Sequence, residues 1–102
     1  MNKEIKKEWV KWLKSGAYDQ GMHKLCTKRG DGGYEFCCLG VLTNIYHEEH
    51  GTEFTEYHDH YLPDEVKSWA EIDKRTQYEL VHLNDEEGNS FDEIADYIKE
   101  NL

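Results

Sequence analysis

The chain has 102 residues, of which 37% are hydrophobic and 13% aromatic, and its formal net charge is −10. This length allows one modest hydrophobic core, so we predict a single domain over residues 1–102 that folds around aromatic side chains. The acidic excess excludes proteins that wrap duplex DNA, because neutralised phosphates supply most of the non-specific affinity of that class.

The charge differs between the two parts of the chain. Residues 1–36 hold eight Lys and Arg against five Asp and Glu, whereas residues 37–102 hold four against seventeen. The basic part could hold a small anion, and the acidic part could mimic nucleic acid toward a basic protein. No apolar run approaches the length of a membrane span, and three cysteines do not suit a secreted disulfide framework. We therefore expect a reduced cytoplasmic protein with no membrane partner.

The first predicted element is an amphipathic helix that begins after Asn2 and ends at Gly16. Lysines lie on one of its faces, and the other face collects four apolar side chains, Ile5, Trp9, Trp12 and Leu13. A β-hairpin follows, because Asp31-Gly32 suits the two central positions of a type I′ turn. That turn predicts a register in which Cys26 lies opposite Cys37.

A second long helix is predicted from Cys38 to Gly51, where apolar residues recur with the helical period. Residues 52–62 form either an ordered loop or a short strand at Phe54. Pro63 suits the first turn of a short helix, since its nitrogen has no hydrogen to donate.

The C-terminal part is predicted to be helical on both sides of a loop. Residues 74–83 form a helix with Tyr78 and Val81 facing inward and His82 as a further candidate for that face, and a loop begins at Asn84. Ser90 and Glu93 then have the spacing of a capping box, which opens the last helix. The predicted fold class is α+β, a small antiparallel β-hairpin or sheet packed against four or five α-helices.

The adjacent Cys37 and Cys38 raise a choice between chemistry and packing. Cys38 near a helix N-terminus could act as a nucleophile with His82 as its base, or the thiols could bind a metal. However, the chain has no CxxC pair with zinc-site spacing, and free cysteines commonly pack as small hydrophobic residues. We expect packing, and Gly40 fits it because a missing side chain lets this helix approach the sheet closely.

A histidine-rich group could converge on a divalent metal together with Asp59: His47, His50, His58 and His60. These residues flank an acidic segment, where histidines beside carboxylates are typical of a solvated surface. We therefore predict neither a metal site nor a cofactor.

The third candidate is an anion pocket where the hairpin, the first helix and the Asn84 loop meet. Glycine amides at residues 30–33 could face a phosphate, and nearby cations could pair with it. Aromatic rings could stack on a base, and polar side chains could bind its edges or a sugar. The predicted ligand-binding residues are Trp9, Gln20, Lys24, Lys28, Arg29, Tyr34, Asn84 and Asp85. The alternative is that the lysines are solvated and the tryptophans belong to the core.

Several segments together resemble a known family. They are the pattern W…L..G.Y.Q.G from Trp9 to Gly21, then "FCCLGVL", "LPDEV..W" and "LND..G.SF.EIADYI". In this combination the chain resembles small proteins encoded by tailed phages and prophages, and the resemblance covers nearly its whole length. The resemblance implies no catalytic residues, and it implies a phage accessory protein acting in the cytoplasm of the infected bacterium.

The resemblance also implies a role against host defence. We expect a non-enzymatic protein that binds and sequesters a small nucleotide-like immune signal, because polar positions such as Gln20, Asn84 and Asp85 belong to the family pattern. The alternative is an acidic inhibitor that caps a host defence protein, and a thiol enzyme ranks third. Assembly into a homo-oligomer is compatible with each of these functions.

Overall fold

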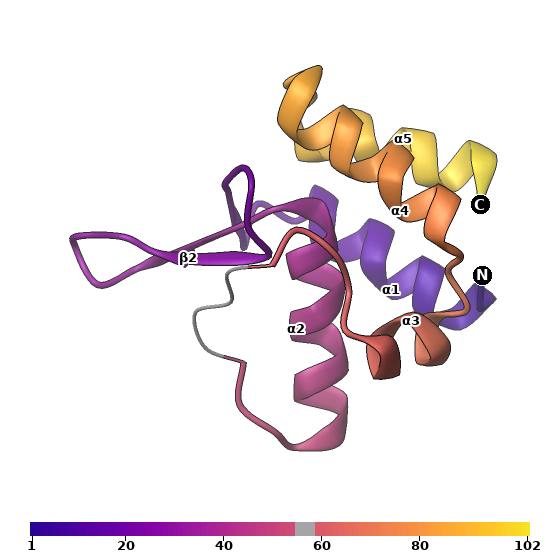
Figure 1. The fold of residues 1–102 in the computed structure, drawn as a ribbon, viewed down its shortest axis with the longest axis horizontal. Helices are drawn as coiled ribbons and strands as arrows, with labels where there is room; N and C mark the ends of the chain where they lie inside the picture. Colours follow the sequence, from indigo (N-terminus) through magenta and orange to yellow (C-terminus); the bar gives the residue numbers. More distant parts are fainter. Residues whose placement is uncertain (55–58) are drawn as a thin grey trace.

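The computed structural model describes residues 1–54 and 59–102. This part of the chain forms five α-helices, one π-helical turn and a small three-stranded sheet. The prediction of an α+β fold is confirmed. Helices α1, α4 and α5 lie together, while the strands and α2 occupy the other side of the molecule (Figure 1). The elements are α1 (Lys3–Lys14), β1 (Asp19–Gln20), β2 (Cys26–Lys28), β3 (Tyr34–Phe36), α2 (Cys38–His50), α3 (Asp64–Ala70), α4 (Lys74–Val81), η1 (His82–Glu86) and α5 (Phe91–Asn101).

The predicted helix ends are set by local signals. Asn2 caps α1, since its side chain accepts a hydrogen bond from the Ile5 N–H at 3.0 Å. Ser90 and Glu93 form both hydrogen bonds of the predicted capping box at the start of α5. Gly51 ends α2 in the left-handed conformation, with φ of 67°. These boundaries confirm the predictions made from the capping residues.

The predicted hairpin register is wrong by one residue. Cys26 lies opposite Phe36 rather than Cys37, and Arg29 donates its backbone N–H to the Gly33 carbonyl at 2.7 Å. The loop therefore has three residues, because Gly32 takes a positive φ of 90° and adds one residue to the turn. Cys37 is left as the N-cap residue of α2.

The sheet contains a strand that the sequence pattern does not predict. β1 pairs in parallel with β3, so the sheet is mixed, with the strand order β1-β3-β2. Asp19 and Gln20 lie opposite Glu35 and Phe36 in this pairing. Two residues are too short to show an alternating pattern, and their pairing depends on contacts far along the chain.

Helix α2 passes through the hydrophobic core at very short distance from the chain before β2. A Cβ atom built on Gly40 would lie only 1.7 Å from the Leu25 carbonyl oxygen. The predicted close approach at Gly40 is therefore confirmed, although its partner is the residue before the strand. The core around this contact contains Trp9, Leu13, Leu25, Cys37, Cys38, Leu39, Val41, Leu42, Ile45, Leu62, Val66, Ala70, Ile72, Leu80, Phe91, Ile94, Ala95 and Ile98.

Two predictions for the segment after Pro63 are wrong. Tyr78 is 46% exposed, whereas Gln77 is buried and its Oε1 accepts a hydrogen bond from the Leu62 N–H at 2.7 Å. Asn84, predicted to begin a loop, lies instead within η1, a π-helical continuation of α4. One residue more in that turn directs Asn84 into the interior, where its amide finds four partners. The short strand considered at Phe54 is not formed by that residue.

Candidate functional site

The fully buried side chain of Asn84 joins several separate parts of the fold. Its Oδ1 accepts hydrogen bonds from the Cys38 N–H at 3.2 Å and from Gln20 Nε2 at 3.0 Å. Its Nδ2 donates to the Gly21 carbonyl at 2.9 Å and to Asp85 Oδ1 at 2.8 Å. An amide has two donor hydrogens and two acceptor positions, so this group is fully engaged within the protein.

The structure therefore brings three predicted site residues together, Gln20, Asn84 and Asp85, but the two amides form their hydrogen bonds within the protein. Gln20 Nε2 donates a second hydrogen bond to the Asn89 carbonyl at 2.8 Å. Trp9 is 0% exposed, and its Nε1 donates to the Cys38 carbonyl at 2.9 Å. The prediction that Trp9 offers a stacking face to a ligand is wrong, because its ring belongs to the core. Gln20 and Asn84 stabilise the junction of η1, β1 and α2.

Asp85, the third residue of this group, faces two histidines. Its side chain is 6% exposed, and its Oδ2 lies 3.8 Å from His23 Nδ1 and 4.0 Å from His60 Nδ1. His23 has a left-handed φ of 71°, and its ring centroid lies 6.3 Å from that of His60. Asp85 thus connects η1 to two loops, and its negative charge opposes rather than favours a phosphate nearby.

The predicted hairpin cation Arg29 is paired with carboxylates of the protein. Its guanidinium lies 2.7 Å from Asp19 Oδ2 and 3.2 Å from Asp31 Oδ1. The hydrogen bond with Asp19 and the charge of Asp31 raise the pKa of Arg29, so its charge is retained and locally balanced. A phosphate would have to displace two carboxylates to reach this side chain.

The other predicted hairpin residues are dispersed. Lys28 and Tyr34 lie opposite each other at the exposed side of the strands, and Lys24 is half-buried in the preceding loop. The hairpin projects away from the helices (Figure 1). Lys24, Lys28 and Tyr34 therefore do not line a common pocket with the residues of α1.

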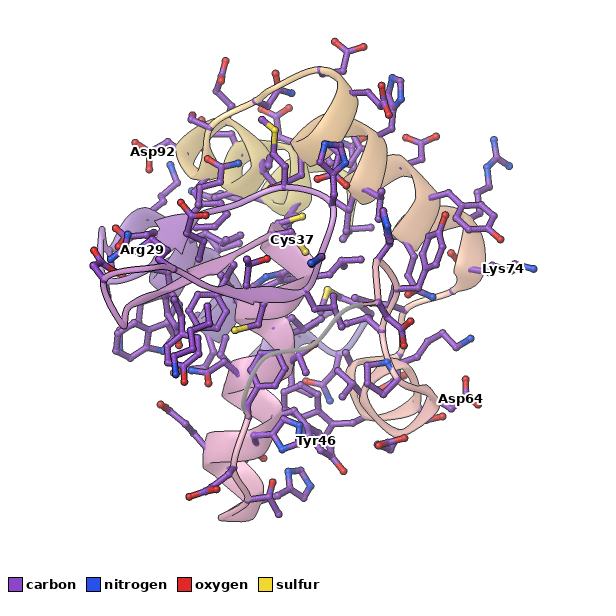
Figure 2. The ribbon with its side chains drawn as sticks, turned by 60° about the vertical axis from the view of Figure 1, so that its left-hand side comes forward. Arg29, Cys37, Tyr46, Asp64, Lys74 and Asp92 are labelled. Carbon is purple, nitrogen blue, oxygen red and sulfur yellow. The ribbon has the colours of Figure 1, made fainter. Side chains whose placement is uncertain are left out.

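The adjacent thiols are core residues, as predicted. Cys37 is 4% exposed and Cys38 is fully buried, and both are free (Figure 2 shows Cys37 inside the molecule). Burial raises the pKa of Cys37 to about 12 and the pKa of Cys38 well above its ordinary value. Both thiols are therefore protonated at neutral pH. His82, the candidate base, instead lies 3.2 Å from Glu87 at the surface.

The histidines of the predicted metal group are separated by their packing. The His47 ring stacks on Phe54 with centroids 5.3 Å apart, and the His50 ring stacks on Tyr46 at 4.0 Å. His58 lies outside the described residues, and the His60 ring faces the Asp85 carboxylate on η1. Across residues 1–54 and 59–102, no group of three or more His, Cys, Asp and Glu side chains could hold a metal ion.

A hollow of about 540 Å³ lies between α1 and the end of α5, and we call it the lysine hollow. Its apolar lining comes from Met1, Val10 and Leu102. Five cations surround this lining, Lys3, Lys6, Lys7, Lys11 and Lys99. Its volume lies within the roughly 300–1,000 Å³ usual for sites of small organic ligands.

Most of these lysines lack a carboxylate partner. In the part of the chain that the structure describes, Lys3, Lys6, Lys7 and Lys99 form no ion pair. The ammonium of Lys11 lies over the Trp12 ring, 5.4 Å from its centroid. This is unusual in a chain with 22 acidic side chains against 12 basic ones. The lysine hollow therefore presents uncompensated positive charge.

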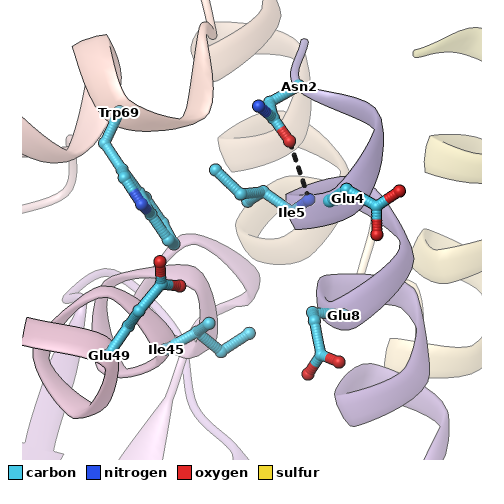
Figure 3. A pocket seen from close by; sticks show the side chains of 7 residues that line it. All are labelled: Asn2, Glu4, Ile5, Glu8, Ile45, Glu49 and Trp69. Carbon is cyan, nitrogen blue, oxygen red and sulfur yellow. Dashed lines mark hydrogen bonds between the residues drawn. The ribbon is translucent and has the colours of Figure 1, made fainter.

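A second hollow, of about 320 Å³, lies on the other side of α1, and we call it the acidic hollow. Figure 3 shows Glu4 and Glu8 on α1 facing Glu49 on α2, with the Trp69 ring reaching across from α3. Asn2, Ile5 and Ile45 complete its lining. The two hollows thus place opposite charges on two sides of one helix.

The model of a protein family described as Domain of unknown function (DUF8296) matches residues 1–102. The chain belongs to this family. No curated protein and no solved structure matches the chain. Among the described residues of this DUF8296 chain, no helix has both the length and the apolar character needed to cross a membrane.

The lysine hollow was missed by sequence reasoning, although part of its signal is visible. Lys3, Lys7 and Lys11 recur every four residues, and Val10 interrupts the charged face of α1 with an apolar side chain. What the sequence of this DUF8296 chain does not show is that Lys99, from the last helix, lies beside them.

Proposed function

We propose that this DUF8296 protein is a non-enzymatic binding protein that sequesters a small nucleotide-like anion in the lysine hollow. The observation that carries the proposal is the group of unpaired lysines around an apolar lining. Phosphates supply the negative charge that these ammonium groups can balance, and a base or sugar can cover the apolar lining.

The net charge of −10 does not prevent such binding. Interactions between exposed charges fall off over a Debye length of about 8 Å at physiological ionic strength. The carboxylates nearest on α1, those of Glu4 and Glu8, line the acidic hollow instead. An anion in the lysine hollow is therefore affected mainly by the lysines around it.

Sequestration without catalysis agrees with the state of the thiols. A nucleophilic cysteine needs a thiolate, and burial keeps Cys37 and Cys38 protonated. In the phage setting that the family resemblance implies, the bound anion would be an immune signal of the infected cell, withdrawn from its receptor.

The acidic hollow favours a second function, the capping of a basic host defence protein. Glu4, Glu8 and Glu49 could receive a cationic side chain, with the face of Trp69 adding a cation–π contact. In this alternative the lysine hollow has no ligand, and charge reversal at Glu49 disables the protein.

The test is calorimetric titration of the purified protein with a panel of nucleotides, at about 50 mM salt. We expect saturable binding by the wild type, and loss of binding in the double variant Lys6→Glu, Lys7→Glu. Lys74→Gln is the matched control, because Lys74 does not line the lysine hollow and its ammonium lies over the Tyr78 ring, 5.6 Å from its centroid. The filtrate of the denatured protein should contain a phosphorylated molecule, identified by its mass and ultraviolet absorbance, where the ligand is retained during purification. If no nucleotide binds the wild type, the proposal is wrong.

A further inference from the structure

We infer that the ligand of the lysine hollow carries phosphates separated by a nucleoside, as in a dinucleotide or a short single strand. This inference rests on the proposed function and names the ligand class. Its basis is the arrangement of the cations, which form an extended row rather than a compact group.

The row consists of Lys3, Lys7 and Lys11, which lie at i, i+4 and i+8 on α1. Successive residues of such a row have Cβ atoms about 6 Å apart, and the row extends about 12 Å along the helix. Phosphates joined through one nucleoside have a comparable separation. The phosphates of a nucleoside diphosphate share one bridging oxygen and lie much closer together, so they can reach only one pair of the row.

Repulsion between the lysines of the row destabilises α1, and a bound anion would relieve this repulsion. Like charges at i, i+4 destabilise a helix, and no carboxylate within the described residues pairs with Lys3 or Lys7. A ligand with separated phosphates would place one negative charge between each successive pair of lysines. The nucleoside between the phosphates would then lie over Val10 and the rest of the apolar lining.

Two further lysines lie outside the row, and they also suit a ligand whose phosphates are well separated. Lys6 lies beside the row on α1, and Lys99 faces it from α5, near Leu102. They can contact the phosphates from a second side without shortening the distance between them. The lining contains no aromatic ring, so affinity depends on phosphate contacts more than on stacking of the base.

The experiment compares two probes of similar charge and equal phosphate number, the 5′-phosphorylated dinucleotide pApA and ADP. We expect pApA to bind at least tenfold more tightly than ADP, because it reaches one more lysine. Equal affinity would overturn the inference and leave the proposed function standing. Failure of both probes to bind would overturn the proposed function and the inference with it.

Separated phosphates can come from a small signalling molecule or from single-stranded nucleic acid. Cyclic diadenylate and a hexa-adenylate strand are the probes that distinguish these two sources. Tighter binding of the cyclic dinucleotide identifies a small signalling molecule, and tighter binding of the strand identifies single-stranded nucleic acid. Binding of both more weakly than ADP would contradict the inference.

Variants at the two ends of the row test its length. Lys3→Gln and Lys11→Gln should each weaken pApA binding about tenfold and leave ADP binding nearly unchanged, because ADP can use the pair that remains. The plot of log affinity against log salt for pApA should have a slope of about −1.4 for two neutralised phosphates, and each variant should reduce its magnitude by about 0.7, since it leaves one phosphate without its end lysine. Lys74→Gln should change neither quantity. Urea midpoints equal to the wild type would show that the variants are folded, and an unchanged slope in both end variants would contradict the inference.

Discussion

Replacement of Gly40 by alanine tests the contact on which the packing of α2 depends. The new Cβ atom would lie 1.7 Å from the Leu25 carbonyl oxygen and 2.7 Å from its carbonyl carbon. Contacts of a real Cβ atom below 3.0 Å are essentially absent, so one side must move by at least about 1.3 Å. The obstacle is backbone, which cannot rotate away as a side chain can.

The expected cost follows from what this displacement disrupts. The Leu25 carbonyl accepts a hydrogen bond from the Cys37 N–H at 3.3 Å, and both residues are buried. Overpacking costs about 1–3 kcal/mol, and an unpaired buried N–H costs about 1–3 kcal/mol more. Alanine recovers about 1 kcal/mol through its higher helix propensity. We therefore expect Gly40→Ala to lower the free energy of unfolding by about 1–5 kcal/mol.

The assay is urea denaturation followed by tryptophan fluorescence, since Trp9 is buried in the core. Gly30→Ala is the matched control, because a Cβ atom at that position would meet nothing within 4 Å and its φ is ordinary. Its free energy of unfolding should stay within about 0.5 kcal/mol of the wild type. A Gly40→Ala protein as stable as the Gly30→Ala protein would refute the packing described for α2.

Three further predictions concern the buried polar and titratable groups. Asn84→Asp should lower the free energy of unfolding by at least about 2 kcal/mol in urea denaturation, because it removes two donated hydrogen bonds and places a second carboxylate beside Asp85; unchanged stability would contradict the network. Iodoacetamide at pH 7.5 should label Cys37 and Cys38 slowly in the native protein and rapidly in urea, and rapid native labelling would contradict their raised pKa values. Burial lowers the pKa of His47, so its contribution to stability is complete above pH 6.5 and is lost as the pH falls through the lowered value. The melting temperature of His47→Gln should therefore fall less between pH 7.5 and 5.5 than that of the wild type, and an equal fall would contradict this reasoning.

The helices of this fold are largely predictable because their signals are local. The Asn2 cap, the box formed by Ser90 and Glu93, and the left-handed Gly51 each act within one turn of the residue that carries the signal. Gly40 is also predictable as a close contact, since glycine is a poor helix former and an apolar helical stripe tolerates it mainly where two backbones approach each other. Its partner Leu25 is not predictable, because it depends on the path of the chain before β2.

The errors arise where one residue changes the geometry. A third loop residue, with Gly32 at positive φ, shifts the hairpin so that Cys26 faces Phe36. One extra residue in the π-helical turn directs Asn84 inward, and the helical period alone cannot show this. Tyr78 and Gln77 are adjacent on α4, and the buried amide is selected by its hydrogen bond to Leu62, a contact from another segment.

For the candidate site, the chemical type of a residue predicts ligand binding less well than whether its polar groups are already paired within the protein. Arg29 has the chemistry to bind a phosphate, but Asp19 and Asp31 already balance its charge. The amide of Asn84 has the chemistry to bind a base edge, but all its hydrogen-bonding positions are occupied. In contrast, the sequence pattern assigns Lys3 and Lys7 to a solvated face, and they are among the cations that the described chain leaves unpaired.

The distribution of charge across α1 connects the two proposed functions to one structural fact. Lysines on one side of this helix and Glu4 and Glu8 on the other are close in sequence, yet they do not pair within the described residues. Pairing them would stabilise the helix by a few tenths of a kcal/mol for each pair, while it would discharge both hollows. Keeping the charges apart costs this small stabilisation, and it leaves the lysine hollow, within the described part of this acidic chain, with positive charge that attracts an anion. The net charge of −10 disfavours anion binding over most of such a surface, and the lysine hollow is a place among the described residues where the local charge opposes this effect.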